Sequence, residues 1–155
     1  MSTDLLAPSA RSHPRRAELD CYPVTSMITS RYADMDLNGH LNNLALETMH
    51  ENIRATLNSR LFPHVYEVAV RDLRLLAAQH VVHFLAEAHW PATICAAIGV
   101  GRVGRTSYVV GSALFVDETC VSICDTVLVV AGEGGPTPIP EDARARMDAV
   151  RLRPE

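Results

Sequence analysis

The sequence predicts an α+β fold, in which one long helix lies against a sheet of long antiparallel strands. Apolar residues recur with a helical period over residues 43–58, and four stretches after residue 75 have the character of extended strands. Short turns, such as the one at Asp117 and Glu118, join these strands without intervening helices, which argues against a βαβ arrangement. At 155 residues the chain can bury one sizeable core, so we expect a single main domain over residues 23–131.

The segments on either side of this domain have a different composition. Residues 1–22 are rich in Ser and Pro, and we expect them to form a disordered leader. A basic cluster at residues 11–16 has no continuous apolar stretch beside it, so the leader does not have the pattern of a signal peptide. Residues 132–155 are predicted to form a Gly/Pro linker and a short helix over 141–150, with acidic residues in its first turn.

A first strand is predicted over residues 24–31, and the central helix follows. This helix is predicted to begin at Asn42 or Asn43, because an asparagine side chain there can accept a hydrogen bond from a free backbone N–H. It should end near Asn58. One side of the helix is an apolar stripe made of Leu46, Met49, Ile53 and Leu57. A second stripe is polar and contains Glu47, Glu51, Arg54 and Asn58.

Four further strands are predicted over residues 76–88, 93–103, 107–117 and 119–131. The 93–103 strand carries bulk on one face only, because the other face consists of Cys95, Ala97, Gly99 and Gly101. Something must approach that face closely, and we expect it to be the helix. In the 119–131 strand, Asp125 alternates in step with valines and isoleucines. It either faces the core with a hydrogen-bond partner, or the alternation breaks there.

Composition excludes several classes of protein. The net charge of -4 gives no electrostatic reason to expect a nucleic-acid partner, and no segment is long and apolar enough to span a bilayer. We therefore expect a soluble cytoplasmic protein. Cys120 and Cys124 lie four residues apart on one predicted strand, roughly 13 Å, which is too far for a disulfide. The histidines show no familiar ligand spacing, so we expect no metal site and no cofactor.

Residues 31–43 carry the strongest chemical signal, with the sequence Arg-Tyr-Ala-Asp-Met-Asp-Leu-Asn-Gly-His-Leu-Asn-Asn. Asp34 and Asp36 precede an Asn-Gly turn, His40 follows it, and the helix then begins. A carboxylate is therefore held close to a helix N-terminus, where unpaired N–H groups carry partial positive charge. This combination suits acyl chemistry, because the acid can attack or activate water while the N–H groups hold an oxyanion.

The segment resembles the opening motif of the hotdog-fold acyl-CoA thioesterases of the 4-hydroxybenzoyl-CoA thioesterase-like group. The matching residues are Arg31, Tyr32, Asp34, Asp36, Gly39, His40, Asn42 and Asn43. Three further motifs match in the same order, namely Glu51 with Arg54, the Gly-Arg-Thr-Ser turn at 104–107, and Pro-Ile-Pro-Glu at 138–141. The resemblance covers most of residues 24–147. It departs at Leu46 and at residues 84–88, which are positions that help to shape the acyl pocket.

The resemblance implies a hotdog fold, in which an antiparallel sheet wraps around one long central helix. It implies hydrolysis of an acyl-CoA thioester to a carboxylic acid and CoA, without a metal or redox cofactor. It also implies a homodimer or a dimer of dimers, with sheets joined edge to edge and sites at the interface.

The resemblance also suggests roles for individual residues. Asp36 would be the nucleophile or the base for water, and the backbone N–H at Asn43 would stabilise the oxyanion. His40 would be a general base, or a residue oriented by a hydrogen bond to the backbone. Some members carry the catalytic acid on the helix, so Glu47 and Glu51 are reserve candidates.

The turn between the third and fourth strands is the candidate CoA contact, through Arg105, Thr106 and Ser107. Each of these site residues also has a purely structural interpretation. Asp36 would then satisfy local N–H groups in its turn, Glu51 would form an ion pair within the helix, and Arg105 would be an exposed turn residue.

Two other function classes stay open from the sequence. A hydratase or dehydratase on the same fold would use an Asp and a His on either side of an Asn, as Asp36, Asn38 and His40 superficially do. The gap before His40 is one residue shorter than in those lyases, and Gly39 stands in place of their Pro. The second class is a non-catalytic hotdog protein that binds an acyl or CoA ligand or serves as a dimeric scaffold. The intact Asp36 argues against that class.

Overall fold

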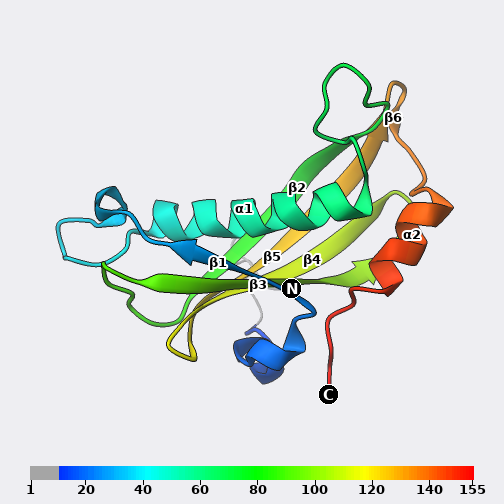
Figure 1. Cartoon of the computed structure of the whole chain (residues 1–155). Coiled ribbons are helices and arrows are strands. Elements are labelled where there is room, and N and C mark those ends of the chain that lie inside the picture. Colours follow the sequence, from blue (N-terminus) through cyan, green and yellow to red (C-terminus); the bar gives the residue numbers. More distant parts are fainter. Residues whose placement is uncertain (1–10) are drawn as a thin grey trace, which may run out of the picture.

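The computed structural model describes residues 11–155 and shows a curved antiparallel sheet wrapped around one long helix, α1 (Asn43–Leu61) (Figure 1). The strand order is β1-β3-β4-β5-β2, and the short β6 pairs with β5. The strands are β1 Val24–Thr29, β2 Arg74–Phe84, β3 Thr93–Val103, β4 Ser107–Val116, β5 Thr119–Gly132 and β6 Gly135–Pro136. The predicted α+β class and the central helix are confirmed. Among the described residues, no helix has the length and apolar character needed to cross a membrane.

The strand predictions hold closely at β3, β4 and β5, and β2 shows the main difference. This strand ends at Phe84 rather than at residue 88. The chain leaves the sheet there, because the backbone of Ala88 is hydrogen-bonded to a segment outside the sheet. Its carbonyl accepts a 2.7 Å hydrogen bond from the N–H of Leu41. The loop between β2 and β3 is therefore fastened to the segment that enters α1, and this contact helps to form the candidate site.

Helix α1 packs on the bulky face of β3, not on its small-residue face as we expected. Ile94, Ile98 and Val100 share one hydrophobic core with the apolar stripe of the helix. The opposite face of β3 is approached by single side chains from other segments. A Cβ added at Gly99 would lie 2.8 Å from both Leu152 and Pro23, so the small residue is required by a close contact outside the helix layer.

The predicted disordered leader needs correction for residues 11–22. These residues form two 3-10 turns, η1 (Pro14–Ala17) and η2 (Leu19–Cys21), on the face of the sheet opposite α1 (Figure 1). The guanidinium of Arg16 donates a 2.6 Å hydrogen bond to Asp125, which explains why this acid interrupts an apolar strand. Residues 1–10, the remainder of the predicted leader, lie outside the described part of the chain.

The C-terminal segment closes one end of the sheet. Part of the predicted linker pairs with β5 as β6, and the predicted short helix is α2 (Glu141–Asp148). Ala143 and Met147 of α2 are buried in the main core. The chain then pairs with β3 through a bridge between Arg151 and Val100, and Leu152 covers the small-residue face of that strand.

Candidate active site

The segment that enters α1 is anchored by an internal ion pair. Asp34 is buried at the end of η3 (Tyr32–Asp34), where it accepts hydrogen bonds from the backbone N–H and the guanidinium of Arg31 at 2.8 Å. The hydrogen bond from the Arg31 side chain holds the pKa of this carboxyl below its usual range. Asp34 is therefore the structural acid of the motif, and its negative charge is already paired with Arg31.

Asp36 is exposed and lies in the turn that follows. One carboxylate oxygen, Oδ1, accepts hydrogen bonds from the N–H groups of Asn38 at 2.8 Å and His40 at 3.3 Å. Gly39 closes the turn with a φ of 77°, a conformation in which glycine is strongly favoured. The other oxygen, Oδ2, makes no hydrogen bond with any residue that the structure describes. The turn therefore orients the carboxylate through one oxygen and leaves the second available for chemistry.

The first turn of α1 presents backbone donors beside this turn. The side chain of Asn42 caps the helix, because its oxygen accepts a 2.8 Å hydrogen bond from the N–H of Ala45. The N–H groups of Asn43 and Leu44 find no acceptor within residues 11–155, as expected for the first helical positions. They are therefore free to bind an anion or a polarised carbonyl oxygen.

A cleft of about 710 Å³ brings these groups together. It is lined by Asp36, Asn38, His40, Leu41, Asn42, Asn43, Leu44, Leu46, Phe84, Leu85, Ala86, Glu87 and Ala88. Asp36, His40 and Asn43, to which the sequence resemblance gave catalytic roles, thus border one cavity. Its apolar lining includes Leu46 and Phe84, both at positions where the sequence departs from the family motif.

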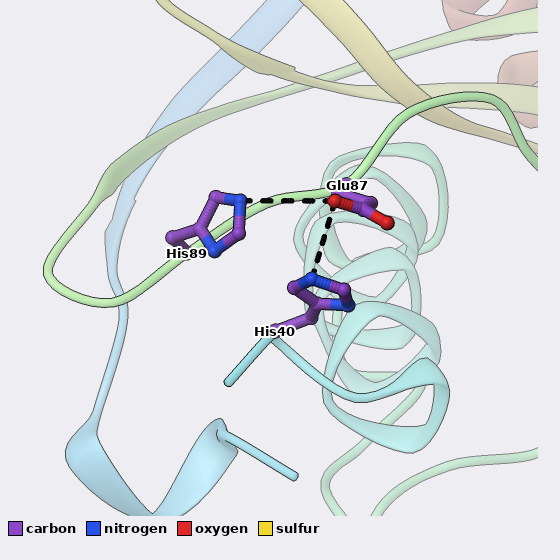
Figure 2. Close-up of side chains that lie close together, drawn as sticks. All are labelled: His40, Glu87 and His89. Atoms are coloured by element: carbon purple, nitrogen blue, oxygen red, sulfur yellow. Dashed lines mark ion pairs between the residues drawn. The ribbon is translucent and has the colours of Figure 1, made fainter. Parts of the chain in front are cut away.

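His40 makes side-chain contacts rather than the backbone hydrogen bond that we considered. Its Nε2 lies 3.2 Å from the carboxylate of Glu87, and its ring packs edge-on against the ring of His89 with centroids 4.9 Å apart (Figure 2). Both partners come from the loop between β2 and β3. The sequence offered no signal for this cluster, because the three residues come from two separate loops.

Glu51, a reserve candidate for the catalytic acid, lies outside this cleft. Its carboxylate forms an ion pair with Arg54 one turn along α1. It lines a second groove of about 430 Å³ together with Leu44, Glu47, Thr48, Arg54, Ala77 and His80. Because Leu44 borders both cavities, the grooves are neighbours along the helix, but the structure does not bring Glu51 or Glu47 into contact with the Asp36 turn.

The predicted CoA contacts lie at the far end of the sheet. The cleft adjoins the Thr93 end of β3, whereas Arg105, Thr106 and Ser107 follow its other end, roughly 30 Å away along an extended strand. The backbone carbonyl of Arg105 accepts a 2.9 Å hydrogen bond from Ile139, but its side chain is exposed and forms no ion pair within residues 11–155. Within the single chain, this turn and the cleft are separate.

A buried polar row was not predicted from the sequence. His50, Arg54 and Asn58 lie four residues apart on α1 and are all buried against the sheet. The side chain of Asn58 accepts a 2.7 Å hydrogen bond from Tyr108, and Arg54 donates to Thr126 at 3.1 Å. Arg54 and Asn58 belong to the predicted polar stripe of the helix, whereas His50 does not. Only the sheet supplies the hydrogen-bond partners that make burial of the three side chains possible.

No family model matches the sequence, and no curated protein matches it. The structure is similar to that of a thioesterase from Thermus thermophilus complexed with coenzyme A and Zn, with a TM-score of 0.76, 25% identity and coverage of 86% of this chain and 98% of that one. A thioesterase-superfamily structure from a Jannaschia species matches with a TM-score of 0.72 and 26% identity, over 81% of each chain. A DHNA-CoA thioesterase from Staphylococcus aureus matches with a TM-score of 0.67 and 19% identity, over 81% of this chain and 90% of that one.

These similarities and the architecture define the fold. The chain has the hotdog fold of the thioesterase-superfamily proteins, so the resemblance predicted from its motifs is confirmed. Several of the similar structures are thioesterases, and two of them are named for the CoA thioester that they act on.

Proposed function

We propose that the protein is a thioester hydrolase that converts an acyl-CoA to a carboxylic acid and CoA. The observation that carries the proposal is the position of Asp36, whose Oδ2 is unengaged by the described residues in a cleft bordered by the free N–H groups of the first turn of α1. The similarity in fold to thioesterases supports it.

In the proposed reaction, the thioester carbonyl oxygen lies against the backbone N–H of Asn43. This donor and the positive end of the helix stabilise the negative charge that develops on the oxygen in the transition state. The Oδ2 atom of Asp36 either takes a proton from the attacking water or attacks the carbonyl carbon itself. The C–S bond then breaks, and CoA leaves as its thiolate, a good leaving group that takes up a proton to give the free thiol. If Asp36 has attacked directly, a mixed anhydride remains on its carboxylate, and a water molecule then hydrolyses it to release the carboxylic acid and restore Asp36.

The proposal is tested by measuring free-thiol release from a panel of acyl-CoA substrates that varies chain length and includes aromatic acyl groups. Release above the rate of spontaneous hydrolysis supports a thioesterase. Ultraviolet absorbance with an enoyl-CoA substrate provides the opposing test, because a hydratase would consume the conjugated double bond without releasing thiol. A protein that binds acyl-CoA but does neither would belong to the non-catalytic class.

A homodimer would explain how the distant turn at residues 104–107 serves the cleft. β2 is an edge strand of 11 residues that, within the described part of the chain, pairs with β5 alone, and it exposes Leu76 and Phe84. Such an edge needs a partner or protection. Pairing with a second copy of β2 about a two-fold axis would make one continuous sheet and cover these side chains.

Antiparallel pairing of this kind would also complete the site. The cleft adjoins the Phe84 end of β2, while the Arg74 end lies at the same end of the sheet as the 104–107 turn, because Arg74 pairs with Ala131 and Ser107 with Val129. A two-fold axis across β2 places the Arg74 end of one protomer beside the Phe84 end of the other. The partner's Arg105 would then approach the cleft. Within one protomer, no Arg or Lys of the described residues lines this cleft.

We therefore expect a dimer, or a dimer of dimers, in solution. Light scattering should give at least twice the 17.0 kDa mass of the chain at micromolar concentration. Leu76→Lys, which places a charge on the exposed edge strand, should shift the mass toward that of the monomer without unfolding it. A wild-type protein that stays monomeric at these concentrations would contradict the proposed edge-to-edge pairing.

Arg105→Ala should raise KM for acyl-CoA roughly threefold to tenfold and leave kcat nearly unchanged, because an exposed cation–phosphate contact contributes on the order of 1 kcal/mol to binding. The measurement compares steady-state kinetics on acyl-CoA with those on a truncated thioester that lacks the nucleotide, for which the variant should behave like the wild type. Arg102→Ala, an exposed arginine three residues earlier, is the matched control. An unaltered KM in Arg105→Ala would mean that the phosphates bind elsewhere.

A further inference from the structure

Three potential metal ligands converge at the margin of the cleft. His40 precedes α1, whereas Glu87 and His89 lie in the loop between β2 and β3, and Figure 2 shows the three side chains pointing toward one another. One ligand atom from each lies within 4.8 Å of the other two. The Oε2 atom of Glu87 is 3.2 Å from Nε2 of His40 and 4.0 Å from Nε2 of His89.

The backbone holds these residues in place. The 2.7 Å hydrogen bond from the N–H of Leu41 to the carbonyl of Ala88 joins the two segments at the positions next to the ligands. Ala88 is buried, so the backbone is held in place at this residue. The side chains of its two neighbours, Glu87 and His89, extend from this backbone toward His40. The N–H of Asp36 also donates to the carbonyl of His40 at 2.9 Å, which fixes the other side of the cluster. The site therefore rests on a rigid backbone frame, although its side chains are accessible.

The hydrogen bonds of His89 leave the correct nitrogen free for a metal. Its Nδ1 lies 3.2 Å from the carbonyl oxygen of Gly39. A carbonyl only accepts, so Nδ1 must carry the proton and Nε2 keeps a lone pair directed at the cluster. A histidine whose second nitrogen donates to a backbone carbonyl is the usual arrangement of a metal-bound imidazole.

The ligand spacing requires only a small contraction. Two imidazoles and a carboxylate suit zinc and similar transition ions, and they do not suit magnesium or calcium, which prefer oxygen ligands. Metal–ligand bonds of about 2.0–2.1 Å in a tetrahedral site place the ligand atoms roughly 3.4 Å from each other. The widest gap must therefore close by roughly 1.4 Å, which side-chain rotation allows because Glu87 and His89 are more than half exposed.

We propose that His40, Glu87 and His89 form a binding site for a divalent transition-metal ion of the zinc type. The ion links the segment that enters α1 to the loop between β2 and β3. Because His40 and Glu87 both line the cleft, the ion lies at its margin, and three protein ligands leave one coordination position for solvent or another ligand. The inference does not rest on the proposed hydrolysis, since metal binding is measured without a substrate.

The test titrates ZnCl₂ into the tag-free full-length protein, after chelator treatment, by isothermal titration calorimetry. The wild type should bind one equivalent per chain. His89→Ala should weaken binding by about 100-fold or more, since loss of a ligand exceeds the 10- to 100-fold effect of losing a supporting hydrogen bond. Glu87→Gln, which keeps the side-chain size and removes the charge, should weaken it in the same direction. Binding of Co²⁺ followed by its visible absorbance should report the same ranking.

His64→Ala is the matched control. His64 is exposed and lies 2.7 Å from Glu67, so it forms a His–Glu pair that lacks a third ligand in the described structure. This variant should bind zinc like the wild type, and zinc should raise Tm in both but not in His89→Ala. All variants keep the four cysteines, so equal binding in wild type and His89→Ala would assign the metal to thiols or other groups and overturn the proposal. Absence of stoichiometric binding to the wild type would also overturn it.

Discussion

Asp36→Asn should lower kcat for acyl-CoA hydrolysis by about 10²-fold or more, with little change in stability. The structural reason is that the two carboxylate oxygens differ in their contacts: Oδ1 accepts the hydrogen bonds of the turn, and Oδ2 is available for the reaction. The amide oxygen of asparagine can take the place of Oδ1 and accept from the N–H groups of Asn38 and His40, so the turn keeps its hydrogen bonds. The amide nitrogen then replaces Oδ2, and it can neither accept a proton nor attack a carbonyl.

Steady-state thiol release and a thermal melt check this prediction together. Glu51→Gln is the matched control. It also neutralises an exposed acid, but this acid lies on α1, where it borders the second groove and forms an ion pair with Arg54. We expect its kcat to stay within a few-fold of the wild type. Near-normal turnover by Asp36→Asn would remove Asp36 from its assigned role, and Glu51 and Glu47 would become the leading candidates.

The sequence predicts the fold well wherever one local pattern decides the structure. The 93–103 strand matches β3 at both ends because alternating bulk and turn residues mark it clearly. The same alternation led to a wrong assignment of its faces. A glycine such as Gly99 indicates that another segment packs closely against the strand. It does not reveal whether that segment is a helix or, as the structure has it, the side chains of Pro23 and Leu152.

The candidate site contains residues that the sequence could bring together by local geometry and residues that it could not. Asp36, Asn42 and Asn43 are close in sequence, so the turn and the helix cap bring them together by local geometry alone. Glu87 and His89 reach His40 only because a backbone hydrogen bond joins two loops more than 40 residues apart, and no spacing in the sequence records that contact.

The contacts of the buried polar face of α1 could not be predicted from the sequence either, because its partners lie on distant strands. His50 was one of several histidines without a recognisable pattern, yet its ring has no exposed surface. Nδ1 lies 2.8 Å from the hydroxyl of Ser112 and Nε2 lies 2.9 Å from that of Ser122. Each hydroxyl can donate or accept, so a neutral imidazole is fully satisfied between them. Burial lowers the pKa of His50 to about 3, and the nearby charge of Arg54 acts in the same direction.

Acid should therefore destabilise the protein through His50. An unfolded histidine titrates near pH 6.5, so between about pH 6.5 and pH 3 the unfolded chain binds a proton that the folded protein does not. The stabilising contribution is complete above pH 6.5, and it declines by about 1.4 kcal/mol for each pH unit below it. From pH 7 to pH 5, the free energy of unfolding should fall by about 2 kcal/mol from this residue alone.

Urea unfolding of wild type and His50→Gln at pH 7 and pH 5, at one protein concentration, isolates this term. Glutamine offers one donor and one acceptor to Ser112 and Ser122 but does not titrate, so the variant should be less sensitive to the same pH change by about 2 kcal/mol. The pKa of His80 is also lowered, chiefly by burial, but His80 is present in both proteins and cancels in the comparison. Because the pKa of Asp34 is held low, its stabilising charge is lost only at more acidic pH, as the pH falls through that lowered value, and does not enter this range. Equal losses in the two proteins would show that His50 is protonated in the folded state, and that the two serine hydroxyls stabilise an imidazolium rather than a neutral ring.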